Sequence, residues 1–323
     1  MPVPQIRVTT ASRLHFGMFS FGQCGERQFG GVGLMIDEPA IRLRISPADR
    51  TEAIGPLAER AAEFARRVLG QLDAKSRCGV RIEIDSAPRE HVGLGSGTQL
   101  GMAVAAGIYA LHSTDAAATA ELARLAGRSG RSSIGTHGFA AGGVLVEAGR
   151  RRPEELSPLI ARVELPAEWR FLLLVPRRTV GLFGAAEREA FAKIPPVSMS
   201  TTEALAREAL LHLVPAAIEA DFDEFSRSLY RYGTTAGECF ASQQNGAFLD
   251  RRTAELAAAI RRLGCEGVGQ SSWGPTLFAA VRDETAGSEL ARQLRAATDL
   301  GDYDALVTRP CNRGATIVHD HRE

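Results

Sequence analysis

Three glycines fall within five residues in one segment, Pro88-Arg89-Glu90-His91-Val92-Gly93-Leu94-Gly95-Ser96-Gly97-Thr98-Gln99. Alternating apolar residues over 80–84 predict a strand before it, and small and apolar residues over 98–111 predict a largely buried helix after it. Glycines let the backbone approach a ligand closely, and the N-terminus of a helix attracts anions. The segment therefore predicts a phosphate or diphosphate site, while a plain glycine turn with a Ser/Thr helix cap stays an equal alternative.

The glycine spacing excludes the two commonest phosphate motifs. No lysine follows the last glycine, as a Walker A loop requires, and the Gly93-x-Gly95-x-Gly97 order is not that of a Rossmann fingerprint. The hydroxyl groups of Ser96 and Thr98 add ligands for a phosphate oxygen or a metal ion. We therefore expect an anion site of another kind.

Elsewhere, strands and helices are mixed without a regular βαβ rhythm, which predicts an α+β fold. The predicted strands cover residues 6–10, 41–45, 80–84, 143–147 and 169–175, the two ends of 268–281, and a final pair at 305–308 and 315–319. The predicted helices cover residues 57–72, 98–111, 116–127, 201–214, 215–232, 253–263 and 284–297. Charges and prolines around residues 150–166 predict a boundary between domains 1–165 and 166–323.

Composition narrows the class of protein. The formal net charge is zero, so no global field favours nucleic acid or a membrane surface, and local groups must hold any anion. No segment has the apolar length of a signal peptide or a membrane span. An odd number of scattered cysteines predicts free thiols in a reducing compartment, so we expect a cytoplasmic protein. The cysteines are Cys24, Cys78, Cys239, Cys265 and Cys311.

Three segments resemble the motifs of the GHMP kinase superfamily. Residues 12–17 read Ser-Arg-Leu-His-Phe-Gly, residues 88–97 resemble the Pro-x-x-x-Gly-Leu-Gly-Ser-Ser signature, and residues 267–275 resemble the C-terminal glycine-rich motif. The resemblance implies a two-domain fold, with a ribosomal-protein-like β-α domain at the N-terminus and a ferredoxin-like domain at the C-terminus. It also implies a site in the cleft between them.

The segment Ser132-Ser133-Ile134-Gly135-Thr136-His137 departs from the kinase pattern. Many kinases of the superfamily have Ser-Gly-Ile-Asp here, and Gly135 takes the place of the aspartate. Without a nearby base, an alcohol is a poor nucleophile towards a phosphoryl group. An ATP-dependent kinase would need a substitute base such as Asp37 or Glu187, and a catalytically silent phosphate-binding protein is a third alternative.

Four segments resemble the β-ribofuranosylaminobenzene 5'-phosphate synthase family instead: residues 13–17, 30–34, 93–99 and 269–275. The resemblance implies a pentosyltransferase that condenses 5-phosphoribosyl 1-diphosphate with 4-aminobenzoate or 4-hydroxybenzoate and releases CO2 and diphosphate. It also implies a place in tetrahydromethanopterin biosynthesis and one-carbon metabolism, and a homodimer.

This reaction has three physical requirements. Negative charge develops on diphosphate as it leaves C1 of the ribose, so backbone N–H groups and Mg2+ must absorb it. The aromatic carbon that carries the carboxylate must face C1, which requires positioning. CO2 must then leave, and a carboxylate removed from water favours that step.

We expect specific residues to meet these requirements. The predicted diphosphate-binding residues are Gly93, Gly95, Ser96, Gly97, Thr98, Gln99 and Ser132, with Mg2+ on Ser96. The predicted substrate contacts are Gly30, Gly31, Gln270, Ser271, Ser272 and Trp273, with neutral donors for the 5'-phosphate at 270–272. Trp273 lies in a Gly/Ser/Pro loop, which favours a contact with the aromatic acid over core packing.

Three predicted catalytic residues each have a structural alternative. The planar guanidinium of Arg13 suits a carboxylate or a phosphate, but it also suits an ion pair. His15 could donate a hydrogen bond, stack on the ring of the substrate, or be a satisfied core histidine. His137 could contact the diphosphate or have a structural role.

Other polar residues are weaker candidates. Arg177 and Arg178 could clamp phosphate, but a solvated pair of arginines is favoured. Asp37, Glu38 and Glu187 could bind Mg2+ or be plain surface residues. Residues 319–321 read His-Asp-His, which are metal-ligand types, but we expect a frayed C-terminal tail there.

Overall fold

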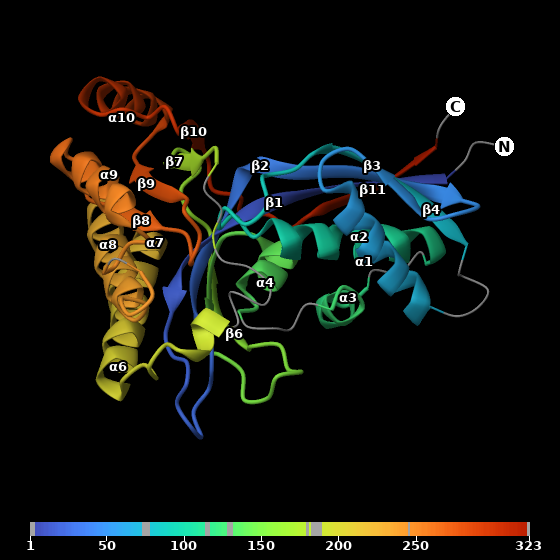
Figure 1. Ribbon diagram of the computed structural model, residues 1–323, viewed down its shortest axis with the longest axis horizontal. Coiled ribbons are helices and arrows are strands. Elements are labelled where there is room, and N and C mark those ends of the chain that lie inside the picture. Colours follow the sequence, from blue (N-terminus) through green and yellow to red (C-terminus); the bar gives the residue numbers. More distant parts are fainter. Residues whose placement is uncertain are drawn as a thin grey trace.

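Two sheets with helices packed against them make up the chain, as the computed structural model shows for residues 4–72, 78–113, 117–127, 132–178, 181, 189–244 and 246–321 (Figure 1). The first sheet has the order β11-β1-β2-β4-β3, and β5 and β6 extend it from β2. The second sheet has the order β10-β7-β9-β8. This mixed architecture confirms the predicted α+β class.

The strands are β1 (Pro4–Met18), β2 (Gly31–Ala48), β3 (Glu52–Ile54), β4 (Gly79–Ser86), β5 (Val144–Glu147), β6 (Leu159–Val163), β7 (Arg170–Pro176), β8 (Val268–Gln270), β9 (Leu277–Val281), β10 (Tyr303–Thr308) and β11 (Thr316–His321). The helices are α1 (Ala58–Gln71), α2 (Ser96–His112), α3 (Thr119–Leu125), α4 (Ile134–Ala141), α6 (Met199–Glu208), the π-helical turn η2 (Ala209–Leu213), α7 (Val214–Glu219), α8 (Phe222–Glu238), α9 (Arg251–Arg262) and α10 (Glu284–Ala297). None of these helices, among the described residues, is long and apolar enough to cross a membrane.

The first sheet is built on the long antiparallel pair β1–β2. Alternate residues of both strands, among them Val8, Leu43 and Ile45, are buried against α2, as the alternation in the sequence predicts. α2 packs against β1 and β2 of this sheet and against the helices α1, α3 and α4 (Figure 1), so most of its circumference is buried. The predicted buried helix is confirmed, because a helix covered on several sides must be apolar on several sides.

The second sheet is joined to the first by a common core. Leu14 of β1 and Leu34 of β2 belong to the same buried cluster as Phe171 and Leu173 of β7 and residues of α8. The predicted boundary at 165/166 falls between β6 of the first sheet and β7 of the second. Because β11 returns to the first sheet, the division into domains 1–165 and 166–323 stays a prediction.

The predicted final strand pair is wrong. β10 pairs with β7 in the second sheet, whereas β11 pairs with β1 in the first, from Pro4↔His321 to Thr9↔Thr316. The expected frayed tail at 319–321 is wrong for the same reason. The N-terminal half of β1 would otherwise present an unpaired edge, and β11 supplies its partner.

The predicted helix break at Pro215 is also wrong. The chain continues through α6, η2 and α7, and it breaks only at Ala220, which has a φ of 58°. Proline lacks the N–H group that an α-helix needs, and the π-turn of η2 shifts the hydrogen bonding just before it. The next helix begins where the Asp221 side chain accepts a hydrogen bond from Glu224 N at 3.0 Å.

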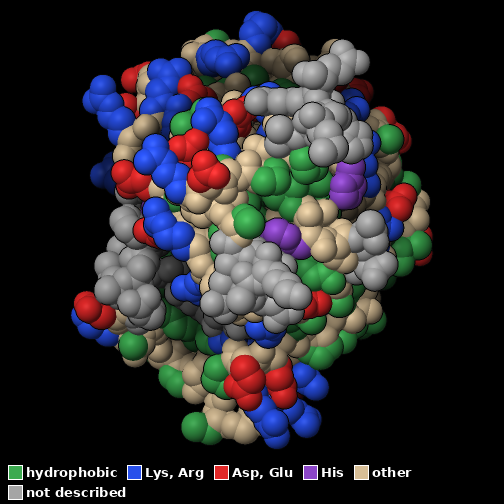
Figure 2. Space-filling model, turned by 90° about the vertical axis from the view of Figure 1, so that its right-hand side faces the viewer, with side chains coloured by type: hydrophobic (Ala, Val, Ile, Leu, Met, Phe, Trp, Pro, Cys, Tyr) green, Lys and Arg blue, Asp and Glu red, His purple; other side chains and the backbone are tan. Residues whose placement is uncertain are grey.

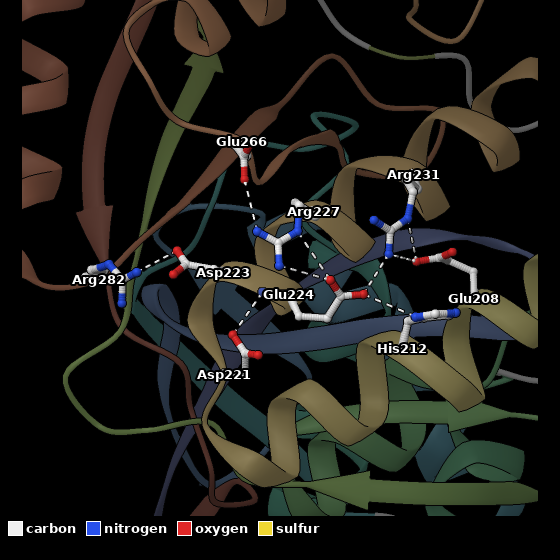
Figure 3. A network of polar contacts seen from close by, with 9 residues as sticks. All are labelled: Glu208, His212, Asp221, Asp223, Glu224, Arg227, Arg231, Glu266 and Arg282. Atoms are coloured by element: carbon white, nitrogen blue, oxygen red, sulfur yellow. Dashed lines mark hydrogen bonds and ion pairs between the residues drawn. The ribbon is translucent and has the colours of Figure 1, made fainter.

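A network of ion pairs joins these helices at the surface (Figure 3). Glu224 of α8 lies 3.1 Å from Arg227, 2.8 Å from Arg231 and 3.1 Å from His212 of η2. Arg231 also pairs with Glu208 of α6 at 2.8 Å. Partial burial acts to raise the pKa of Glu224, but the hydrogen bonds from Arg231 and Arg227 outweigh it and lower that pKa.

Candidate functional site

The four motif segments of the sequence meet where β1 passes between the two halves of the chain. Arg13 N of β1 donates to Leu94 O of the glycine loop at 3.0 Å. Two residues further on, His15 N donates to Ser271 Oγ at 3.1 Å, and Ser272 N donates to His15 O at 2.8 Å. Three of the four segments are therefore joined by direct hydrogen bonds, and β2 adds the fourth through the pair His15↔Gly33.

The glycine loop and the C-terminal loop pack backbone against backbone. A Cβ atom on Gly274 would overlap Gly93, and Gly93 itself has a φ of 91°. Ser271 Oγ donates to Gly93 O at 2.6 Å, so the only hydroxyl proton of the fully buried Ser271 is used inside the protein. These glycines serve loop packing, and Ser271 joins the loops instead of offering the donor predicted for a 5'-phosphate.

The N-terminus of α2 lies beside a basic side chain. Gly95, with a φ of 72°, is the N-cap of α2, and no side chain caps the helix. A Cβ atom on Gly95 would lie 3.2 Å from Arg13 Cβ and 3.4 Å from Arg13 Nε. A guanidinium group and the positive end of a helix dipole therefore lie together at the glycine loop, and this arrangement suits an anion.

Gln99, another predicted diphosphate ligand, uses its side chain for hydrogen bonds inside the protein. Its Oε1 accepts from Thr10 Oγ1 at 2.6 Å, and its Nε2 donates to Gly135 O at 2.7 Å. The side chain therefore holds α4 against α2. A Cβ atom on Gly135 would lie 3.1 Å from Thr98 Cγ2, so an aspartate at this position would have to displace Thr98.

His15 is buried, with 2% of its surface exposed. Its Nε2 lies 3.2 Å from Ser132 Oγ, while its buried Nδ1 has no hydrogen-bond partner among the described residues. Burial, and then the charge of Arg13, lower the pKa of His15 well below its ordinary value. The imidazole is therefore neutral. His15, predicted to be catalytic, and Ser132, predicted to bind diphosphate, are in direct contact, while both of these roles stay predictions.

Glu147, at the end of β5, is a buried carboxyl group that the sequence reasoning missed. It is 0% exposed, and Ser133 N donates to its two oxygens at 2.8 and 3.1 Å. Burial raises the pKa of Glu147 to about 7, against hydrogen bonds from Ser132, Ser133 and Ser157 and the charge of Arg13. The signal available in the sequence was an acidic residue at the end of the apolar strand 143–147.

The other predicted catalytic histidine does not join this group. His137 Nε2 lies 2.7 Å from Ser157 O, and this contact ties α4 to the segment before β6. The contact supports the structural alternative, and a role towards diphosphate stays a prediction.

A small cavity next to His15 is lined mainly by aromatic and small residues. Its walls include Phe191, Phe240 and Trp273, with Ser272 at the rim. Trp273 is 7% exposed and packs against Phe240, with ring centroids 5.1 Å apart. The core packing that the sequence argued against is therefore present, while Trp273 also lines the cavity and its contact with substrate stays a prediction.

Three of the remaining predicted substrate residues also have internal roles. Gln270 lines the cavity, but its Oε1 accepts from Leu249 N at 2.7 Å. A Cβ atom on Gly31 would overlap Gly17 O, and one on Gly30 would lie 2.6 Å from the carbonyl carbon of Ala148. Close packing of the backbone therefore explains both glycines. Ser272 has a φ of 57° and is exposed, so its hydroxyl faces solvent.

The weaker candidates lie elsewhere. Asp37 pairs with Arg309 and Glu38 with Arg42, beside a separate cavity of about 430 Å³ that none of the four motif segments lines. Arg177 pairs with Asp304 at 2.8 Å and is exposed, as is Arg178, which agrees with the solvated alternative. Glu187 lies outside the described residues.

The described part of the chain has no metal cluster, and the face in Figure 2 has no field of a single charge sign. Among the described residues, no group of three or more His, Cys, Asp or Glu side chains could hold a metal ion. On the face in Figure 2, basic side chains are interspersed with acidic ones, and hydrophobic and histidine side chains lie nearer the middle. Local groups must therefore hold an anion, and Ser96 as a Mg2+ ligand stays a prediction.

Comparison with known proteins identifies the family. The chain is 31% identical to the beta-ribofuranosylphenol 5'-phosphate synthase of Archaeoglobus fulgidus, over 97% of this chain and 99% of that protein. It is 29% identical to the protein of the same name from Methanothermobacter thermautotrophicus, over 98% and 99%. The chain belongs to this synthase family. It is therefore an enzyme of the pentosyltransferase type, as the resemblance implied.

The synthase family shares its fold with kinases and decarboxylases. Residues 56–143 match the GHMP kinases N terminal domain, and residues 213–299 match the GHMP kinases C terminal family. Homoserine kinase from Cytophaga hutchinsonii superposes with a TM-score of 0.69 at 16% identity, over 97% of both chains. Mevalonate pyrophosphate decarboxylase from Streptococcus pyogenes gives 0.68 at 14%, over 97% of this chain and 98% of that one. The predicted GHMP-type fold is confirmed.

Proposed function

We propose that this synthase-family enzyme condenses 5-phosphoribosyl 1-diphosphate with 4-aminobenzoate or 4-hydroxybenzoate and releases CO2 and diphosphate. The observation that carries the proposal is the similarity over nearly the whole chain to relatives named for a ribofuranosylphenol 5'-phosphate product. A phenol with a carbon-linked ribose fits an acceptor whose carboxylate is replaced at the ring carbon. The reaction would belong to tetrahydromethanopterin biosynthesis.

The leaving diphosphate fits the glycine loop. Gly95 begins α2 there, and the Arg13 side chain lies against it, so that a helix N-terminus and a cation both face an incoming anion. Charge that develops on the diphosphate oxygens is stabilised where the donors are already in place.

Mg2+ is the expected cofactor, and it would neutralise part of the diphosphate charge when bound. Ser96 and Thr98 offer hydroxyl oxygens at the loop, without a carboxylate cluster among the described residues. Mg2+ commonly keeps waters and binds through substrate phosphates with few protein ligands. This donor set therefore fits an ion that enters with the diphosphate.

We place the aromatic acceptor at the small cavity beside His15, whose walls must part to admit a ring. Phe240 and Trp273 line it with flat apolar surfaces, and the neutral His15 is the polar group next to them. An aromatic acid held there would lose most of its hydration, which lowers the cost of expelling CO2. The principal task of the protein is then to align the ring carbon with C1 of the ribose.

The test uses carboxyl-labelled 4-hydroxybenzoate and 4-aminobenzoate with 5-phosphoribosyl 1-diphosphate and Mg2+. We expect labelled CO2 from at least one acceptor, only when the ribosyl donor is present. Arg13→Gln should lower kcat/KM by about a hundredfold through loss of a fixed cation, while Arg177→Gln, at an exposed ion pair, serves as the matched control. ATP turnover with an alcohol acceptor, and no labelled CO2, would contradict the proposal.

We also propose a cytoplasmic homodimer without nucleic-acid or membrane partners. The free state of all five cysteines is compatible with a reducing compartment. Light scattering on the purified full chain checks the dimer, and a monomeric mass at working concentration would contradict it.

A further inference from the structure

A chain of three polar side chains leads from the cavity into the protein interior. His15 lines the cavity, its Nε2 lies 3.2 Å from Ser132 Oγ, and Ser132 in turn hydrogen-bonds Glu147. Glu147 ends the chain in a fully buried position. Neither a kinase motif nor the predicted phosphate contacts account for a buried carboxyl group at this place.

The hydroxyl group of Ser132 has only one arrangement when Glu147 is ionised. Ser132 Oγ accepts from Ile134 N at 3.2 Å and donates its single proton to the carboxylate. Its remaining lone pair must then accept from His15, so Nε2 carries the proton of the neutral imidazole. Nδ1 is left as an unprotonated acceptor, and it is the buried atom without a described partner.

Protonation of Glu147 reverses the direction of the hydrogen bonds that join Glu147, Ser132 and His15. All the direct partners that hold Glu147 are donors, namely Ser133 N and the hydroxyls of Ser132 and Ser157, so a protonated carboxyl group must turn one hydroxyl around. When Ser132 is the one that turns, it donates to His15 Nε2, and the imidazole proton moves to Nδ1. The charge state of Glu147 is thus coupled to the tautomer of His15.

We infer that His15, Ser132 and Glu147 form a proton relay that takes the proton from the hydroxyl or amino group of the aromatic acceptor. The inference rests on the proposed function, because it assigns the relay to that reaction. An acceptor that loses this proton carries more electron density at the opposite ring carbon, where the new bond to C1 forms. His15 is the catalytic member, and Ser132 and Glu147 act through it.

The electrons and protons balance. The acceptor reaches the buried Nδ1 of His15 only when the side chains that cover this atom move aside. As the C1–O bond to diphosphate then breaks and the C1–C bond forms, the acceptor proton passes to His15 Nδ1, the Nε2 proton to Ser132 and the Ser132 proton to Glu147. When CO2 leaves, the electron pair of the broken C–C bond restores the aromatic ring, and the protons return along the same path. No oxidant, reductant or further reactant is needed.

The charged and titratable groups around the relay favour this direction of transfer. Arg13 of β1 acts on both His15 and Glu147, and it disfavours a cationic imidazole that would trap the proton midway. Tyr232 of α8 also faces Glu147, and burial raises the pKa of its hydroxyl well above the ordinary value, so it stays neutral. Glu147, with a pKa of about 7, is therefore the proton acceptor of the group.

The decisive experiment compares two acceptors in wild type, Glu147→Gln and Ser132→Ala. With 4-hydroxybenzoate, both variants should lose about a hundredfold in kcat, the size expected for general base catalysis. With 3,5-difluoro-4-hydroxybenzoate, whose hydroxyl group is already ionised in neutral buffer, the loss relative to wild type should shrink to a few-fold. An equal loss with both acceptors would show a merely structural role and overturn the relay. Glu224→Gln, at the surface network, is the matched control and should keep full activity.

The pH profile provides a second readout. Wild-type kcat should fall on the acid side with a midpoint near the Glu147 pKa of about 7, because the protonated carboxyl group cannot accept. Glu147→Gln should lack this acid limb. Retention of the same limb in the variant would assign it to another group and contradict the inference.

A third readout needs no turnover and therefore separates failure of the relay from failure of the proposed function. Nitrogen-15 spectra of the full chain, with His15 assigned through its loss in His15→Gln, should show the Nε2–H tautomer when Glu147 is ionised. The signal should shift towards Nδ1–H on acidification in wild type and not in Glu147→Gln. An Nδ1–H tautomer in alkaline buffer would overturn the relay, whereas the expected spectra without CO2 release would leave it standing and remove the reaction assigned to it.

Discussion

Glu147 and Glu224 are the same residue type in opposite settings. Glu147 is fully buried, and its direct hydrogen-bond donors are neutral backbone and hydroxyl groups. Glu224 is partly exposed and is bonded by Arg227 and Arg231 (Figure 3). The first has a raised pKa and the second a lowered one. Neutral donors position a buried carboxyl group without fixing its charge, whereas arginines keep it ionised.

The difference separates a group suited to exchange a proton from one suited to hold two helices together. A carboxyl group with a pKa near 7 gains or loses a proton in neutral solution at little cost. A carboxylate held by two guanidinium groups gives up its charge only in acid.

The largest effect is expected from removal of each side chain. Glu147→Ala leaves the buried Ser133 N–H and the Ser157 hydroxyl without their acceptor, and it opens a void, so it should lower the free energy of unfolding by about 3–5 kcal/mol. Glu224→Ala should cost less than about 1 kcal/mol, because its ion pairs face solvent. Urea denaturation of both variants measures the two values. Equal losses would contradict the contrast.

A smaller change in the free energy of unfolding is expected when pH is varied across the titration of Glu147. The folded-state pKa of Glu147 is raised, so its contribution to stability is present below the unfolded value near 4.5 and is lost as pH rises through about 7. The loss should reach about 3 kcal/mol between those limits. Glu147→Gln should remove this component from the stability profile. A wild-type profile that rises over this window, with no difference in the variant, would refute the raised pKa.

The smallest effect concerns Glu224. Its pKa is lowered, so its contribution is present above the unfolded value near 4.5 and is lost as pH falls through the folded pKa. Glu224→Gln should cost roughly 0.5 kcal/mol in low salt and less in high salt, since screening weakens exposed pairs. Thermal unfolding at two salt concentrations checks this. A salt-independent loss would mean that packing, not charge, is the contribution of Glu224.

Local patterns in the sequence were enough for much of the fold. The alternation in β1 and β2, the small apolar residues of α2 and the glycine segments are all local, and each was placed in the correct element. The errors at Pro215 and at 319–321 arose from tertiary context. A π-turn absorbs the missing N–H of proline, and a strand forms only because β1 offers an edge.

The candidate site could be predicted only in part, because the partners of its side chains also depend on tertiary context. Sequence spacing brought out Arg13, His15 and the glycine loop, but the partners of Gln99 and Ser271 depend on which segments meet in three dimensions. Glu147 was missed because strand pairing brings it to the site. Glu147 of β5 pairs with Gly31 on one side of β2, and His15 of β1 pairs with Gly33 on the other side. A single acidic residue at the end of an apolar strand indicates a buried carboxyl group at most, and it does not show which residues surround that group.

The contact between Gly93 and Gly274 limits how this enzyme can diversify. Each loop occupies the space that a side chain on the other loop would need, so neither glycine can be replaced separately by a larger residue. A smaller residue at the other position cannot compensate, because glycine is already the smallest. Engineering of a new acceptor range should therefore leave this crossing intact and vary the cavity wall around Phe191 and Phe240. The two glycines are a constraint that variants inherit together.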